Sequence, residues 1–153
     1  MAARGVRVSV VRLPQVHDQD KQGLVTYLID LAHEKGVSAF VGDGTNRWPA
    51  VHRLDTARLY TLVLKKGTAG ARYHVVAEEG VPLRDIAQVI GRRLNVPVVA
   101  KSPEEAANHF GWLAVFVSGD ALASSALKQE RLGWRPVQPG LIPDLERARN
   151  LEF

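Results

Sequence analysis

Hydrophobic and polar residues alternate near the start of the chain, and further along they recur at a helical spacing. Residues 5–13 read GVRVSVVRL, which predicts a strand that ends in a loop at Pro14, because proline has no N–H for a sheet hydrogen bond. Between residues 23 and 35, leucines and a tyrosine recur at the i, i+3, i+4, i+7 spacing of an amphipathic helix, and Gly36 ends it.

This alternation of strand and helix continues to the end of the chain. The run from Ser102 to Glu105 has the composition of a capping box and predicts the start of a helix. Asp55 occupies the position expected for the N-cap of another helix. The other predicted elements are strands over residues 37–41, 71–77 and 96–100, helices over residues 82–93, 126–132 and 141–149, and a loop over residues 42–49.

Strands that alternate with helices are typical of an α/β domain with parallel strands and helical crossovers. The 153 residues, 46% of them hydrophobic, fit one domain over residues 1–153. There is no cysteine, which fits a reducing cytoplasm, where we expect the protein. We expect no membrane segment, because charged residues interrupt every apolar run well before it reaches the roughly 18 residues of a span.

The charge pattern gives little support to nucleic-acid binding. The net charge is +4, but the adjacent basic pairs Lys65-Lys66 and Arg92-Arg93 fall at predicted helix ends, where cations complement the helix dipole. We therefore interpret the basic residues as solvated surface and keep a nucleic-acid-binding module as a minor alternative.

Few residues have the spacing of a known catalytic or cofactor motif. Gly42 and Gly44 follow a predicted strand, but Arg47 takes the place of the third glycine of a dinucleotide loop, so a plain turn is the preferred interpretation. The five histidines lack metal-ligand spacing and no nucleophile elbow occurs, so we predict no metal site and no catalytic residue.

Tryptophans in turns are expected to fill gaps in the core, with the indole N–H bonded to a carbonyl. Trp48 has a second interpretation as a platform for a ligand, if Asn46, Arg47 and His52 converge beside it. For His52 two interpretations stay open, a hydrogen bond to nearby backbone and a ligand contact.

Four stretches in order resemble the extended short-chain dehydrogenases/reductases, the NAD-dependent epimerase/dehydratase family. These stretches are residues 8–17 (VSVVRLPQVH), 48–57 (WPAVHRLDTA), 72–77 (RYHVVA) and 125–136 (SALKQERLGWRP). They resemble the family's sixth strand, its His-Val-x-Asp-x-Ala segment, its last sheet strand and its closing Leu-Gly-Trp-x-Pro signature. The resemblance implies a partial Rossmann-like sheet, made of the C-terminal strands, with a small α/β substrate-binding lobe.

Two parts of the family's catalytic equipment are missing. The sequence has no N-terminal Gly-rich loop for NAD(P) and no Tyr-x-x-x-Lys pair. The chain therefore looks like the C-terminal half of such an enzyme, inactive alone and without a cofactor of its own, with NAD(P) bound only if a complementary nucleotide-binding half is supplied.

The resemblance also suggests a site. Pro14 would lie near the nicotinamide of the cofactor, and a substrate would meet Val16, His17, Asn46, Trp48 and His52. The run from Asp18 to Gln22 replaces the family's Gly-rich turn, so the binding loop has a different expected shape.

Our leading hypothesis is a non-catalytic module that binds a small polar ligand, in which Trp48→Ala weakens binding. The alternative is one component of an NAD(P)-dependent oxidoreductase or epimerase that another chain completes. Because the strand over residues 5–13 would expose an edge, we also expect a homo-oligomer that covers it.

Overall fold

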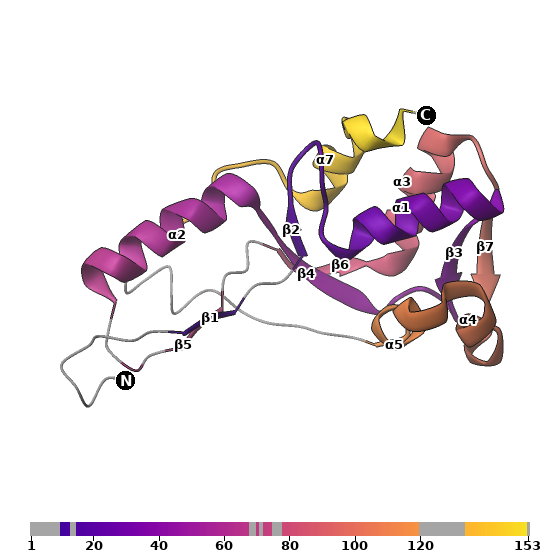
Figure 1. Cartoon of the computed structure of the whole chain (residues 1–153), viewed down its shortest axis with the longest axis horizontal. Helices are drawn as coiled ribbons and strands as arrows, with labels where there is room; N and C mark the ends of the chain where they lie inside the picture. Colours follow the sequence, from indigo (N-terminus) through magenta and orange to yellow (C-terminus); the bar gives the residue numbers. More distant parts are fainter. Residues whose placement is uncertain are drawn as a thin grey trace.

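The computed structural model describes residues 10–12, 15–67, 70, 72–74, 78–119 and 134–152. Over these residues it is an α/β fold (Figure 1), as the alternating pattern predicts. The strands are β1 (Val10–Arg12), β2 (Gln15–His17), β3 (Ser38–Val41), β4 (Arg47–His52), β5 (Arg72–His74), β6 (Glu78–Pro82) and β7 (Val98–Lys101). The helices are α1 (Leu24–Lys35), α2 (Arg53–Lys66), α3 (Leu83–Leu94), α4 (Pro103–Phe110), η2 (Gly111–Leu113), α5 (Ala114–Val117), α7 (Leu141–Glu146) and η3 (Arg149–Leu151).

The described strands pair in three small groups. β1 pairs with β5, β3 with β7 and β2 with β4, each in parallel, while β6 joins the other side of β4 in antiparallel orientation. In Figure 1, α2 lies at one end of the molecule beside β1 and β5, and α1, α3 and α4 surround β3 and β7 at the other end. The group β2–β4–β6 lies between these two ends of the molecule. Elements on both sides therefore fix the position of a site on this group.

Two clusters of buried side chains hold the elements together. The larger one joins α1, α3, α4, β4 and the C-terminal helix α7, and includes Ile29, Ile86 and Leu145, all fully or almost fully buried. The smaller one packs Leu59 and Val63 of α2 on Trp134. Burial of a large aliphatic side chain contributes about 1.5–3 kcal/mol, so these contacts account for the helix positions.

The strand that holds Trp48 corrects a prediction. Residues 42–49 were expected to form one loop, yet Arg47, Trp48 and Pro49 belong to β4. The register of β4 on β6 shifts between Trp48 and Ala50, so Pro49 occupies an irregularity where its missing N–H costs no ladder bond. The plain turn is confirmed at Gly44, which has φ +70° and lies so close to Arg84 that a Cβ would be 2.6 Å from the Arg84 Cβ.

Two further predictions about element boundaries were wrong. Instead of a loop after Pro14, the chain forms β2, because this segment finds a parallel partner in β4. β6 was not predicted, since residues 78 and 79 are both glutamate. This segment is a strand because it finds an antiparallel partner in β4. Leu13, Pro14, the first nine residues and the predicted helix over residues 126–132 lie outside the described part of the chain.

The helix starts and ends agree well with the local sequence signals. α1 ends at Gly36, which has the left-handed conformation expected of a glycine cap. The predicted capping box is confirmed at α4: the Ser102 hydroxyl accepts from the Glu105 N–H, and the Glu105 carboxylate accepts from the Ser102 N–H. The helix over residues 141–149 is shorter than predicted, ending at Glu146 and followed by η3.

Ser102→Ala is expected to lower the free energy of unfolding by about 1 kcal/mol, because the first turn of α4 loses its side-chain acceptor. Chemical denaturation followed by circular dichroism measures this change. Ser102→Thr, which keeps the hydroxyl, serves as the control and should retain most of the stability. Equal losses in the two variants would contradict the cap as the cause.

Candidate functional site

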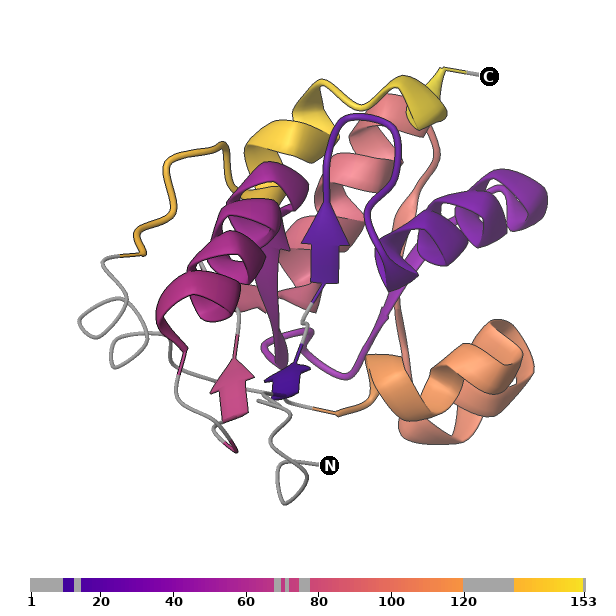
Figure 2. The same cartoon turned by 60° about the vertical axis from the view of Figure 1, so that its left-hand side comes forward.

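The carboxyl ends of β2 and β4 lie side by side and each ends in a histidine. The strands are parallel, and His17 is paired in register with His52. Figure 2 shows the arrows of both strands pointing toward the side where α7 lies. Ligands of open α/β sheets bind outside the carboxyl ends of the strands, so this edge is the place to look for a site.

The two histidine rings meet the carboxylate of Asp144 from α7. His17 Nδ1 lies 2.5 Å from Asp144 Oδ2, and His52 Nε2 lies 3.6 Å from the same oxygen. The rings contact each other edge to face, with centroids 5.5 Å apart. All three residues are buried, so the electrostatic attraction between them is stronger than it would be in water.

The local structure at the start of α2 fixes the orientation of His52. Its Nδ1 accepts a hydrogen bond from the Leu54 N–H, so His52 is the N-cap of the helix. The interpretation of His52 as a histidine bonded to nearby backbone is thereby confirmed. A neutral ring whose Nδ1 accepts must carry its proton on Nε2, the nitrogen that faces Asp144.

Asp55 has a different role from the predicted N-cap. It lies in the first turn of α2, and its buried carboxylate accepts from the backbone N–H groups of Val137 and Gln138 and from the Arg58 guanidinium. The N-cap prediction is wrong because His52 already fills that position. Asp55 instead joins α2 to the segment that precedes α7.

The loop after β2 forms a tight turn around Asp18. Its carboxylate accepts from the N–H groups of Asp20 and Lys21, and it pairs with Arg53 at 3.1 Å. Partial burial acts to raise the pKa of Asp18, but these two N–H groups and the charge of Arg53 outweigh it, so the pKa lies below its usual value. The loop that replaces the expected Gly-rich turn is therefore held by an ionised aspartate.

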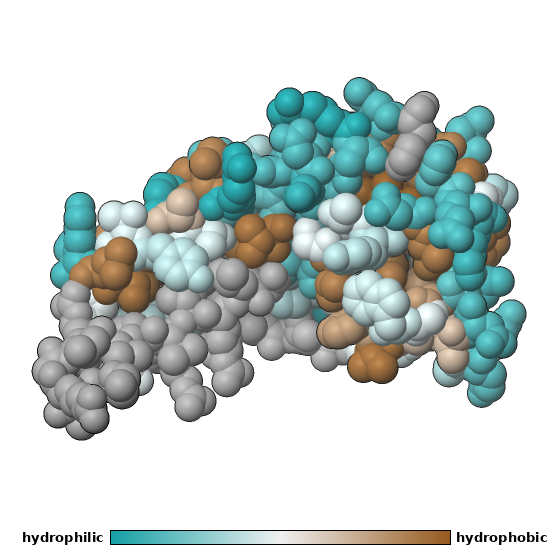
Figure 3. All heavy atoms as spheres, viewed as in Figure 1, coloured by the Kyte–Doolittle hydropathy of each residue, from teal (hydrophilic) through white to brown (hydrophobic). Residues whose placement is uncertain are grey.

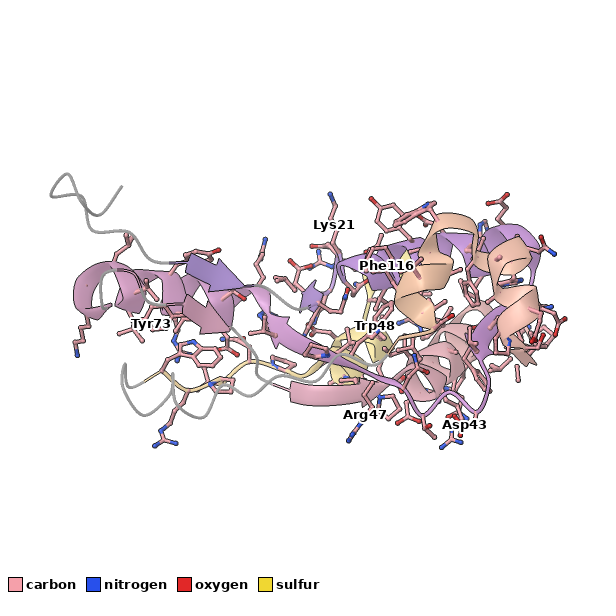
Figure 4. All side chains as sticks on the ribbon, turned by 90° about the horizontal axis from the view of Figure 1, so that it is seen from below. Lys21, Asp43, Arg47, Trp48, Tyr73 and Phe116 are labelled. Carbon is pink, nitrogen blue, oxygen red and sulfur yellow. The ribbon has the colours of Figure 1, made fainter. Side chains whose placement is uncertain are left out.

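This loop borders an open hollow of about 400 Å³ beside the histidine pair. Its lining residues come from β2, the following loop and the start of α2, and are Val16, His17, Asp18, Asp20, Lys21 and Arg53. Asp18 is paired with Arg53, and Asp20 with Arg149 at 3.1 Å. Lys21 makes no ion pair within the part of the chain that the structure describes, and its side chain points outward in Figure 4. The hollow thus offers one ammonium group whose charge is not compensated by a described carboxylate.

Asn46 and Trp48 lie in contact with α5 instead of at the hollow. The indole N–H of Trp48 donates to the Phe116 carbonyl at 3.1 Å, and the Asn46 amide donates to the carbonyls of Val117 and Gly119. Trp48 is buried, as expected for a tryptophan that fills a gap in the core, and Figure 4 shows it beside Phe116 while Arg47 points away. Of the predicted substrate-binding residues, the structure brings together Val16, His17 and His52. Asn46 and Trp48 lie apart from these three, against α5. Pro14 lies outside the described residues.

The other two tryptophans differ from each other. Trp134 is fully buried and its N–H donates to the Asp55 carbonyl at 2.8 Å, as predicted for a core tryptophan. For Trp112 the core prediction is wrong, because its side chain is 60% exposed and contacts the rings of Tyr27 and Phe116 edge to face. Figure 3 shows brown, hydrophobic spheres mixed with pale ones in the region where α4 and α5 lie.

A second hollow, of about 300 Å³, lies between α1, β7 and α4. It is lined by Lys35, Lys101, Glu105, Asn108 and His109. Lys35 already donates to the His109 carbonyl at the end of α4. Burial, followed by the charges of Lys35 and Lys101, holds the pKa of His109 below its usual value. The polar groups of this hollow thus mainly stabilise the helix ends.

Sequence reasoning missed five residues of the site: Asp18, Asp20, Lys21, Arg53 and Asp144. The departure from the family's Gly-rich turn was a signal for the first three. No local pattern singles out Asp144, which is 127 positions from His17. Within the described ranges, no group of three histidine, aspartate or glutamate side chains is arranged to hold a metal ion, and no helix there is long and apolar enough to cross a membrane.

No protein-family model matches the sequence, but two curated yeast proteins do. An uncharacterized protein of Schizosaccharomyces pombe is 52% identical over 145 residues, which are 94% of this chain and 49% of that protein. An uncharacterized protein of Saccharomyces cerevisiae is 48% identical over 149 residues, or 97% of this chain and 50% of that protein. The chain thus spans about half the length of these relatives.

Solved structures of epimerases and dehydratases share the fold. The dTDP-glucose 4,6-dehydratase DesIV of Streptomyces venezuelae, with NAD and TYD bound, matches 99% of this chain and 48% of its own at a TM-score of 0.67 and 20% identity. The UDP-glucose 4-epimerase of Thermotoga maritima, with UDP-glucose, matches 94% of this chain and 45% of its own, at a TM-score of 0.66 and 20% identity. An epimerase of Methanothermobacter thermautotrophicus matches 98% of this chain and 44% of its own, at a TM-score of 0.73 and 14% identity. The expected Rossmann-like α/β fold is confirmed, and these matches cover nearly all of this chain but less than half of each neighbour.

Proposed function

We propose that this chain is the ligand-binding half of an NAD(P)-dependent epimerase- or dehydratase-like protein of the extended short-chain dehydrogenase/reductase family. It binds a small polar ligand with a negative charge in the hollow at the carboxyl ends of β2 and β4. The observation that carries the proposal is the hollow itself, which places Lys21 beside His17 at the sheet edge where α/β folds bind ligands.

The negative charge of the ligand is inferred from the ion pairs around the hollow. Asp18 and Asp20 each have an arginine partner, which leaves the Lys21 ammonium to attract an incoming anion. A hydrogen bond between charged groups contributes about 1.5–3 kcal/mol. Diphosphate groups, such as that of the UDP-glucose in the Thermotoga epimerase structure, have suitable charge and size.

Hydride chemistry would require a second half. The sequence has no Gly-rich loop and no Tyr-x-x-x-Lys pair, and the curated relatives are about twice as long as this chain. The alternative function, an oxidoreductase or epimerase component, is therefore compatible with the same site. In that case another polypeptide or the rest of a longer chain supplies NAD(P).

We expect the half that supplies NAD(P) to join at the outer edge of the β1–β5 pair. β1 and β5 pair only with each other among the described strands, and we infer that the outer edges of this pair accept further strands. In its absence, we propose that a second copy of the chain covers this edge in a cytoplasmic homo-oligomer.

Titration calorimetry with UDP-glucose and with NADPH tests the proposal. We expect UDP-glucose to bind and NADPH not to bind the chain alone. Lys21→Gln should weaken UDP-glucose binding about tenfold, equal to a loss of about 1.4 kcal/mol.

Lys101→Gln, in the second hollow, is the matched control and should leave the affinity unchanged. Equal affinity in the Lys21 variant would contradict the site, and absence of UDP-glucose binding would contradict the class of ligand. Tight NADPH binding would show that the chain holds its own cofactor and would favour the oxidoreductase alternative.

A further inference from the structure

The C-terminal segment of the chain forms part of the support of the ligand hollow. Asp144 on α7 contacts both histidines at the ends of β2 and β4. Farther along, the side-chain amides of Gln22 and Asn150 exchange two hydrogen bonds, of 3.1 Å and 2.9 Å. The Arg149 N–H also donates to the Gln19 carbonyl at 2.7 Å. The loop that lines the hollow is therefore fastened to residues 144–150 at several points.

From this arrangement we infer that Asp144 is a positioning residue of the ligand site. Its carboxylate fixes the ring orientation and the protonated nitrogen of His17, and it makes the shape of the hollow depend on the docking of α7. The inference rests on the proposed function for the identity of the site, and it goes further by assigning the C-terminal helix a role in binding.

The geometry supports a positioning role more strongly than a purely structural one. Asp144 is 1% exposed, and one carboxylate oxygen lies within 3.6 Å of a nitrogen of each histidine. Its other oxygen, Oδ1, accepts no hydrogen bond from the described residues. Since buried carboxylates are costly unless they are paired, helix packing alone would favour an apolar residue at this position.

Each histidine has a different set of constraints, which makes the inference testable. His52 is held twice, by the Leu54 N–H on Nδ1 and by Asp144 near Nε2. His17 Nδ1 faces Asp144 at 2.5 Å and must carry the proton to donate to the carboxylate. Loss of the carboxylate should therefore change the tautomer of His17 and leave that of His52 in place.

Two-bond ¹H–¹⁵N NMR spectra of the histidine rings test this directly, because they distinguish the Nδ1–H form from the Nε2–H form. In the wild-type protein we expect the Nδ1–H form of His17 and the Nε2–H form of His52. Asp144→Ala, which removes every acceptor oxygen, should shift His17 away from the Nδ1–H form, while His52 keeps its form. Glu146→Gln, also on α7 but paired at the surface with Arg92, is the matched control and should change neither ring.

UDP-glucose titration provides the second readout. We expect Asp144→Asn, which preserves side-chain volume, to weaken binding at least tenfold, and Glu146→Gln to have no effect. If UDP-glucose does not bind the wild-type protein, the proposed ligand is wrong, and the NMR spectra still decide the role of Asp144. An unchanged His17 tautomer in a folded Asp144→Ala protein, or wild-type affinity in a folded Asp144→Asn protein, would overturn the inference.

Discussion

Replacing Asp55 by alanine is expected to lower the free energy of unfolding by about 3 kcal/mol, because hydrogen bonds to a charged group contribute about 1.5–3 kcal/mol each and Asp55 accepts several. The Asp55 carboxylate is fully buried and accepts from two backbone N–H groups, those of Val137 and Gln138. Alanine leaves both donors without their acceptor, and it also removes the pair with Arg58. Urea denaturation followed by circular dichroism measures the loss.

Two variants separate this effect from a general sensitivity of the chain to lost carboxylates. Asp55→Asn keeps the shape and one acceptor oxygen, so it should lose less stability than Asp55→Ala. Asp30→Ala, at an exposed position of α1, should change the free energy of unfolding by less than about 0.5 kcal/mol. If Asp55→Ala and Asp30→Ala had the same free energy of unfolding, the role of Asp55 as the link between α2 and residues 137–138 would be contradicted.

Trp48→Ala is expected to cost a similar amount, about 3 to 5 kcal/mol, because it empties a large volume in the main core. It also removes the donor to the Phe116 carbonyl, which is one of the contacts between β4 and α5. We therefore expect faster hydrogen exchange in α4 and α5, in addition to the lower midpoint of thermal unfolding. Weaker ligand binding, as predicted from the sequence, would then follow from lost stability and not from a lost ligand contact.

The chain offers a matched control in its exposed tryptophan, Trp112. Trp112→Ala removes the same side chain from an exposed position, so its cost should stay below about 1 kcal/mol. A Trp48→Ala protein that unfolds at the wild-type temperature but fails to bind UDP-glucose would return Trp48 to the ligand site. Equal destabilisation in the two variants would contradict the assignment of Trp48 to the core.

The sequence predicted those features of the fold that depend on neighbouring residues. The helical spacing and Gly36 located α1, and the Ser102 capping box located α4, because both signals lie within a few positions of the structure they determine. β4 was missed since Pro49 and its neighbours are typical of turns, and only the pairing with β2 and β6 makes this segment a strand. Long-range pairing overrides local preference here.

The site was predictable only in part for the same reason. Val16, His17 and His52 were singled out through a resemblance, and they do lie at the ends of two paired strands. Asp144 stands in an ordinary helical context, and nothing nearby in the sequence points to two histidines that come from distant segments. A residue whose partners are far along the chain gives no periodic signal, so only the folded structure shows it.

The contact between His17 and Asp144 also has a consequence for the order of folding. The two residues are 127 positions apart, so closing this contact restricts a long stretch of chain and cannot occur early at low entropic cost. During synthesis, which proceeds from the N-terminus, β2 is made long before α7 exists. The histidine end of the sheet must therefore wait until Asp144, 127 positions after His17, has been synthesised before it reaches its final arrangement.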